Sequence, residues 1–283
     1  MKPKPALFLT TILLISQLCS TVLAADAPKK LLVVTVTTGF RHSSIPTAEK
    51  VISELAEKSG AFTVDFIHQP DGQPNARQRD ALTKWEDEQL KPALAKLSPD
   101  SLKNYDGVIF ANTTGELPIP DKQGFLDWIK SGGAFIGMHS ASDTFHRWPE
   151  FIDMLGGEFR THGPQVGIEC LCEDHSNPAT AQLGRSWVIL QEEVYQFRNY
   201  NPTNVHDLLY LDKHPNQKTP GHFPVSWTKE YGSGRVFYTS LGHREDIWDT
   251  DPNIPDRINP VATSRAYQAH ILGGIKWALK LDK

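Results

Sequence analysis

The segment Gly132–Asp143 has the composition of a strand followed by a sharp turn that carries reactive side chains. Ligands of open α/β sheets collect in the crevice beyond the carboxyl ends of the strands, so His139, at the end of this strand, is a candidate site residue. The spacing of Gly137–Ala141 imitates a nucleophile elbow, with His139 where a hydrolase or an amidotransferase would place Ser or Cys. The turn therefore predicts an acyl-transfer scaffold without the nucleophile.

Polar side chains also follow three other apolar runs, at the point where each predicted strand ends. The carboxyl ends of parallel strands meet at one edge of a sheet, so these side chains are expected to converge there if the strands share a sheet. The residues at the predicted strand exits are His42, Asn112, Glu116, His139, Asp143 and His243. We expect His162, Glu193 and Tyr195, from the second half of the chain, to close the pocket.

Two kinds of chemistry fit this set. The first is a divalent metal, Zn²⁺ above all, held by His139, His162 and His243 with Glu193 as a further ligand or base. Three His, or two His and a carboxylate, with an open position for water make up most catalytic zinc sites. Such a metal activates water and polarises a carbonyl group.

The second kind of chemistry needs no metal. A histidine cluster with Glu193 can remove a proton beside a sugar carbonyl and return one to a leaving oxygen, because imidazole titrates near neutral pH. In this reading His139, His243 and Glu193 are catalytic. The substrate would be positioned by His42, Tyr195, Asn112 and Asp143.

Structural roles compete with these at single positions. A histidine at a strand exit can simply bond a backbone carbonyl. Ser140 is a potential nucleophile, but it more ordinarily bonds its own turn. Asp143 fits either the N-cap of the next short helix or a group that orients His139. Glu116 suits a cap or a surface ion pair, and His146 is expected to face solvent.

Apolar runs alternate with helical patterns in the first half of the chain. The runs at 31–36, 62–68, 106–111 and 134–138 predict buried strands, and 45–59 and 121–130 predict helices. Residues 76–97 have a charged helical pattern that Pro92 could interrupt. In the second half, strands are predicted at 165–173, 187–191, 207–212, 225–231 and 235–240, with a closing helix over 264–281. This order predicts an α/β fold with a doubly wound sheet.

Composition and the amino terminus bear on compartment and partners. Residues 1–24 have the basic start, short apolar stretch and small residues of a secretory signal peptide, which predicts a soluble, exported domain over 25–283 in the periplasm or outside the cell. No later segment offers the roughly 20 apolar residues of a membrane span. The formal net charge is −4, and it becomes −6 without Lys2 and Lys4, so nucleic acid is a poor partner.

Six ordered motifs carry a resemblance to a known family over about residues 31–280. They are Gly39–His42, Asn112–Glu116, Gly132–Asp143, Leu155–Phe159 with His162, Glu193–Tyr195, and Gly234–Tyr238 with Gly242 and His243. In this combination the chain resembles the ThuA-like family, named for trehalose utilisation, within the class I glutamine amidotransferase-like superfamily. The resemblance implies a three-layer α/β/α, flavodoxin-like fold with a mostly parallel sheet.

The resemblance also implies a role in carbohydrate metabolism. Family members tend to accompany dehydrogenases that make 3-keto-glycosides, so we expect lyase or hydrolase chemistry on an oxidised glycoside or a related sugar. The alternative is a sugar-binding protein without catalysis. Glutaminase activity is not expected, because His139 stands where the superfamily has its Cys. The sequence names neither the sugar nor the oligomeric state, and a homo-oligomer stays open.

Overall fold

A computed structural model describes residues 27–75 and 77–281 of the chain. The predicted signal peptide, residues 1–24, lies outside the described residues. Within the described ranges, every helix is too short or too polar to cross a membrane.

Five parallel strands form one half of a nine-stranded mixed sheet, in the order β2-β1-β3-β4-β11. They are β1 (Lys29–Val34), β2 (Phe62–Ile67), β3 (Gly107–Ala111), β4 (Ala134–Met138) and β11 (Gly234–Thr239). The chain moves outward from β1 to β2 and then returns to β3 on the other side of β1. This reversal of strand order is the point at which doubly wound sheets bind ligands.

Four antiparallel strands extend the sheet beyond β11, in the order β10-β9-β6-β7. They are β6 (Val166–Cys172), β7 (Ser186–Glu192), β9 (His206–Lys213) and β10 (Pro220–Tyr231). A separate antiparallel pair consists of β5 (Glu158–His162) and β8 (Tyr195–Arg198), which sequence reasoning had not paired. The five strands predicted in the second half of the chain are therefore confirmed, and all of them belong to the same sheet as the first half.

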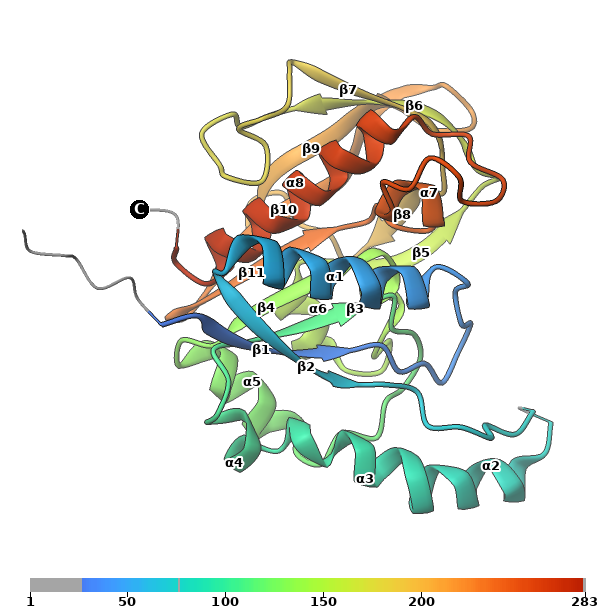
Figure 1. The fold of residues 1–283 in the computed structure, drawn as a ribbon, viewed down its shortest axis with the longest axis vertical. Helices are drawn as coiled ribbons and strands as arrows, with labels where there is room; N and C mark the ends of the chain where they lie inside the picture. Colours follow the sequence, from blue (N-terminus) through green and yellow to red (C-terminus); the bar gives the residue numbers. More distant parts are fainter. Residues whose placement is uncertain (1–26, 76, 282–283) are drawn as a thin grey trace, which may run out of the picture.

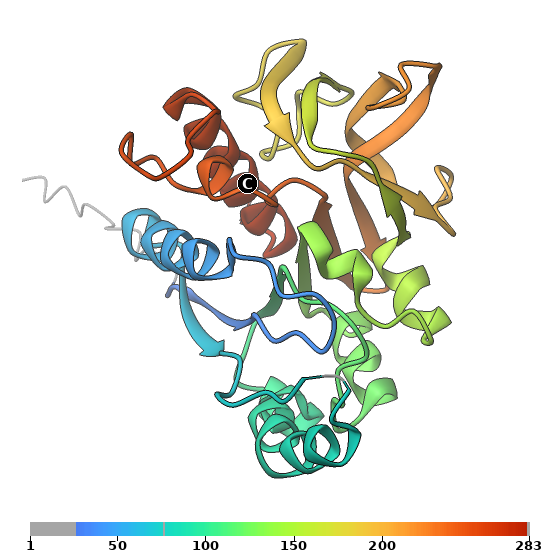
Figure 2. The same cartoon turned by 90° about the vertical axis from the view of Figure 1, so that its right-hand side faces the viewer.

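Helices cover both faces of the sheet and complete the α/β/α layers (Figures 1 and 2). One face carries α1 (Ile45–Ser59), α7 (Glu245–Trp248) and α8 (Val261–Ala278). The other face carries α2 (Arg79–Trp85), α3 (Lys91–Leu94), α4 (Pro99–Leu102), α5 (Lys122–Lys130) and α6 (Pro149–Leu155). Each layer of helices closes its own hydrophobic core against the sheet.

The helix predicted over 76–97, with an interruption left open at Pro92, is continuous through that residue: helical structure runs from Arg79 to Leu97. A π-helical turn, η1 (Glu86–Leu90), precedes α3, and a 3₁₀ turn, η2 (Ala95–Leu97), follows it. The wider π turn relieves the clash that the proline ring makes with an α-helical carbonyl. Buried Leu90 and Leu94 anchor the segment to the core.

Candidate functional site

The predicted convergence of strand exits is confirmed in the sheet. Met138, the last residue of β4, pairs with Ala111 of β3 on one side and with Thr239 of β11 on the other. The residues that follow these strands therefore lie side by side. Figure 2 looks onto this side of the molecule.

The turn after β4 is strained in the manner of a nucleophile elbow. His139 begins the 3₁₀ turn η3 (His139–Asp143) and has a φ of 49°, a left-handed conformation that is uncommon for a bulky residue. Asn112, which follows β3, has a φ of 54°. Such strain persists only where surrounding structure enforces it, and it concentrates at functional sites.

His139 is fully buried and oriented by backbone and side-chain bonds. Its Nδ1 lies 2.8 Å from the carbonyl oxygen of Ser240. Because a carbonyl oxygen only accepts, Nδ1 carries the proton and the lone pair sits on Nε2. Nε2 lies 3.1 Å from the Tyr195 hydroxyl and 3.2 Å from His42 Nε2.

Three further side chains complete the cluster around His139. Glu193 Oε1 lies 3.8 Å from His139 Nε2 and 3.3 Å from His243 Nδ1. Glu193 Oε2 lies 3.0 Å from His162 Nδ1. On the opposite side of His42, Nδ1 lies 3.3 Å from the Ser140 hydroxyl. The Glu193 carboxylate thus faces the imidazoles of His139, His162 and His243. The fourth imidazole, His42, is contacted by Ser140.

The cluster lies at a cavity of about 330 Å³. The lining is made of aromatic side chains and titratable groups: Phe40, His42, Asp143, Phe159, His162, Glu193, Tyr195 and His243. Phe159 packs on Tyr195 with ring centroids 4.4 Å apart, and Phe40 meets His42 edge-on at 4.8 Å. Phe40 is 66% exposed and therefore leaves an aromatic surface open at the rim. Ring faces beside polar groups suit a sugar.

Burial controls the protonation of the imidazoles. Desolvation, reinforced by the neighbouring His243, lowers the pKa of His42 to about 4. Desolvation, together with the neighbouring His42 and His243, holds the pKa of His139 well below its usual range. For His243, burial works in the same direction, but the hydrogen bond and charge of Glu193 outweigh it and raise the pKa. His42 and His139 are therefore neutral near pH 7, while His243 gains protonated character.

Four residues of the cluster could hold a divalent metal. One ligand atom from each of His42, His139, Glu193 and His243 lies within 4.8 Å of all the others. Two nitrogens on one tetrahedral Zn²⁺ would be about 3.3 Å apart, given Zn–N bonds of about 2.0–2.1 Å. The 3.2 Å between His42 Nε2 and His139 Nε2 fits that requirement, and Glu193 Oε1 lies at a similar distance, 3.3 Å, from His243 Nδ1. The Nδ1 of His243 is buried, and its partner among the described residues is Oε1 of Glu193, 3.3 Å away.

The group that could hold a metal differs at one position from the ligands predicted from sequence. His42, expected to position substrate, belongs to the group, whereas His162, expected as a ligand, stands outside it. His162 has a half-exposed side chain and contacts Glu193 from the solvent side. The difference arises because His42 follows β1, next to the switch point, where its ring reaches the centre of the cluster.

Asn112, expected to bind substrate, is fully buried and does not line the cavity. Its Nδ2 instead donates to Ser44 Oγ at 2.9 Å and to the carbonyl oxygen of Gly242 at 3.1 Å. Asn112 therefore ties the exit of β3 to the exits of β1 and β11. We reassign it from binding to positioning.

Asp143 lines the cavity, but it neither caps a helix nor contacts His139 directly. Its Oδ1 accepts from His146 Nε2 at 2.7 Å, and His146 Nδ1 lies 2.8 Å from Glu158 Oε2. His146, expected to face solvent, is thus held between two carboxylates, and its bonds to them raise its pKa to about 9. Glu116 has the predicted peripheral role, because it accepts from the backbone N–H of Arg147 at 2.9 Å.

Glu192 is a positioning residue that sequence reasoning missed. Its fully buried Oε1 accepts from the backbone N–H of Gly242 at 2.6 Å and of His243 at 2.8 Å. This fixes the loop that presents His243. Strand alternation in β7 was the available signal, since neighbouring residues point to opposite sides and only Glu193 was assigned a role.

Comparisons with known proteins agree with this fold. The family described as ThuA, trehalose utilisation, matches residues 30–278. A ThuA-like protein from Parabacteroides merdae ATCC 43184 is 21% identical, with a TM-score of 0.64 over 89% of this chain and 90% of that chain. One from Bacteroides uniformis ATCC 8492 is 20% identical, with a TM-score of 0.59 over 90% and 93% of the two chains. No curated protein matches the chain.

The match covers most of the chain, and five of the six motifs that carried the resemblance contribute a residue to the cavity lining. The chain belongs to the ThuA family, described by its role in trehalose utilisation.

Proposed function

We propose that this protein is an exported carbohydrate-active enzyme that cleaves an oxidised glycoside, with a ketone at carbon 3, by lyase or hydrolase chemistry. The observation that carries the proposal is the group of four ligating side chains, all within 4.8 Å of one another, at an aromatic-walled cavity. The family's description in terms of trehalose utilisation supports a sugar substrate. Export follows from the signal-like residues 1–24.

His42, His139, Glu193 and His243 would hold a divalent metal, with Zn²⁺ the best fit to three imidazoles and a carboxylate. When bound, the metal supplies a Lewis acid that polarises a carbonyl or activates water. The backbone oxygen of Ser240 orients His139, and Ser140 orients His42. Such outer contacts fix the tautomers of metal-binding histidines.

Without a metal at the cluster, the chain's own groups can perform the proton transfers. Glu193, at the cavity, takes the proton from carbon 2, which the ketone at carbon 3 acidifies. The electron pair left on carbon 2 forms the carbon 1–carbon 2 double bond as the anomeric oxygen departs. That oxygen takes a proton from an imidazolium, for which His243 is suited by its raised pKa. Addition of water across the double bond would complete hydrolysis.

Phe159, Tyr195 and Phe40 form the walls against which a sugar ring would rest. The Tyr195 hydroxyl, beside His139 Nε2, is placed to bond a substrate oxygen. These contacts position a ring without supplying a nucleophile, which agrees with elimination rather than acyl transfer. Glutamine hydrolysis is not proposed, because His139 occupies the nucleophile position.

Proton NMR tests the proposal. Purified protein is mixed with 3-keto-trehalose and followed over hours, with and without a chelator, and with Glu193→Gln as the matched variant. We expect new sugar signals from the wild type and none from the variant. Signals that vanish with chelator would establish metal dependence. Line broadening without new signals would show the alternative, a binding protein without catalysis, and neither change would reject the substrate class.

A further inference from the structure

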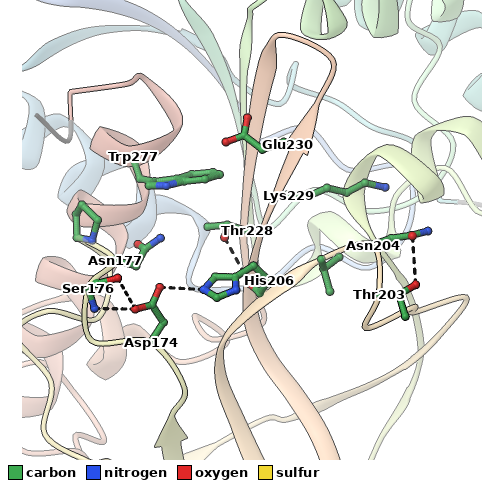
Figure 3. A pocket seen from close by; sticks show the side chains of 12 residues that line it. Asp174, Ser176, Asn177, Thr203, Asn204, His206, Thr228, Lys229, Glu230 and Trp277 are labelled. Atoms are coloured by element: carbon green, nitrogen blue, oxygen red, sulfur yellow. Dashed lines mark hydrogen bonds and ion pairs between the residues drawn. The ribbon is translucent and has the colours of Figure 1, made fainter.

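A second, larger cavity of about 530 Å³ lies at the far end of the sheet from the His/Glu cluster. It is lined by the start of β9, the hairpin end of β10, the end of α8 and the loops before β9 and after β6 (Figure 3). Glu230, in its lining, pairs with Arg235 at the beginning of β11, whereas the cluster lies beyond the end of that strand. Five residues of strand at about 3.3 Å each separate the two ends by roughly 16 Å.

An indole ring forms one wall of this cavity. Trp277, in the last turn of α8, is seen edge-on in Figure 3, with Asn177 and Thr228 to one side of it. The Arg235 guanidinium lies 4.7 Å from the ring centroid, and Arg235 is not among the lining residues. Trp277 itself borders the cavity, so part of its aromatic surface is available to a ligand.

Asn177 presents a fixed hydrogen-bond donor to the same space. Its side-chain oxygen accepts from the backbone N–H of Ala179 at 3.0 Å, which determines which end of the amide is oxygen. The Nδ2 group then points away from that bond, and it donates to none of the described residues. Asn177 is only 6% exposed as a residue, and it belongs to the cavity lining.

The charged groups of the lining are largely neutralised by neighbours. Asp174 accepts from Ser176 and lies 2.9 Å from His206 Nε2. Glu230 pairs with Arg235 at 3.1 Å, and the Lys229 ammonium donates to Asp153 outside the lining. Because the positive groups of the lining already have partners, an anion would gain little binding energy in this cavity. Because the carboxylates of the lining are also paired, a cation would gain little as well. The remaining features, a ring face with several donors and acceptors, suit a neutral polyhydroxylated ligand.

We propose that this cavity is a second saccharide-binding site, in which Trp277 stacks on a sugar ring and Asn177 Nδ2 donates to a hydroxyl. It takes a neutral saccharide of one or two rings and performs no chemistry, since the metal-capable group of the described residues lies at the other end of the sheet. The site does not depend on the reaction proposed for the His/Glu cluster.

Saturation-transfer NMR with trehalose and maltose tests the site. The Glu193→Gln protein provides the background, so that binding at the central cavity is perturbed separately. Asn177→Asp retains the acceptor for Ala179 but loses the donor, and Trp277→Ala removes the ring. His175→Ala, in the same loop but outside the lining, is the matched control.

We expect both variants to weaken saccharide binding by about tenfold, as for loss of one good stacking or polar contact, while His175→Ala binds normally. Thermal melts verify folding, and when the Asn177 and Trp277 variants are made in the protein that retains Glu193, their turnover of 3-keto-trehalose should match wild type. The proposal is overturned if folded Asn177→Asp and Trp277→Ala proteins bind as wild type does. It is equally overturned if neither sugar gives saturation transfer, or if inorganic phosphate displaces the sugar.

Discussion

The polar side chains at the two ends of β11 differ in their burial and in their partners. Beyond its carboxyl end, His139 is fully buried and its Nδ1 donates to the carbonyl oxygen of Ser240. At its amino end, Arg235 and Glu230 pair at the surface, where Glu230 is 62% exposed. Burying a polar group costs free energy unless the group has a hydrogen-bond partner. Buried polar groups are therefore retained only where the surrounding structure fixes their partners. The difference is the basis of the two proposals, chemistry at the carboxyl end and reversible binding at the hairpin end.

The largest expected effect is on turnover. Glu193→Gln keeps the shape of the side chain but removes the charge that faces three imidazoles. We expect kcat for 3-keto-trehalose to fall by about 10²–10⁴, the usual contribution of a general base. Steady-state kinetics measures this, with Glu230→Gln, at the other end of the sheet, as the control. A variant at Glu193 with wild-type kcat would remove the contrast between the two ends.

The next effect concerns the metal. Added Zn²⁺ should raise the Tm of the chelator-treated wild type by roughly 5 °C or more, because a ligand at 100 times its Kd stabilises by about 2.7 kcal/mol. His42→Ala should abolish the shift, whereas His162→Ala should retain most of it. Differential scanning calorimetry distinguishes the two. The opposite pattern would restore the ligand set expected from sequence.

A third prediction concerns the pH dependence of stability, which depends on the buried carboxyl group of Glu192. Burial raises its pKa to about 7, despite the two N–H groups that lower it. The folded state then binds more protons than the unfolded state between about pH 4.5 and 7, so stability falls as pH rises through that window. Glu192→Gln keeps an acceptor and has no charge. We expect it to be up to about 3 kcal/mol more stable than wild type at pH 8 and no more stable at pH 4.

Urea unfolding of chelator-treated protein at the two pH values measures this difference. Glu192→Ala is the control, since it removes the acceptor for Gly242 and His243 and should destabilise at both. A Gln variant less stable than wild type at pH 8 would show that the charge supports the loop.

The smallest effect is expected at His146. Bonds to Asp143 and Glu158 raise its pKa to about 9, so it contributes stability that is full below pH 6.5 and lost as pH rises through 9. Its side chain is 31% exposed, which reduces the gain by solvent screening. We expect His146→Gln to lose about 1–2 kcal/mol at pH 6 and less at pH 10. Equal losses at both pH values, in the same unfolding assay, would contradict this.

Much of the framework could be predicted from sequence. Buried strands are continuous β-branched runs, and the rule that ligands collect beyond strand ends brought His42, His139 and His243 together before any coordinates. Glu193 and Tyr195 were expected to close the same pocket. All of these residues except the fully buried His139 line one cavity.

The remaining details depend on contacts that one sequence does not encode locally. The choice of His42 over His162 depends on which ring reaches the centre of the cluster. The role of Glu192 depends on backbone N–H groups of a loop 50 residues away. His146 lies in a polar stretch that resembles surface, yet β5 brings Glu158 against it.

The central claim is that the cluster removes the proton from carbon 2 of a 3-keto-glycoside. Proton NMR of 3-keto-trehalose in D₂O tests it most directly, by following the carbon-2 signal against a sample without protein. The account predicts that wild-type protein removes this signal faster than the background and that Glu193→Gln does not. Cleavage of the sugar with the carbon-2 proton retained in the product would contradict it.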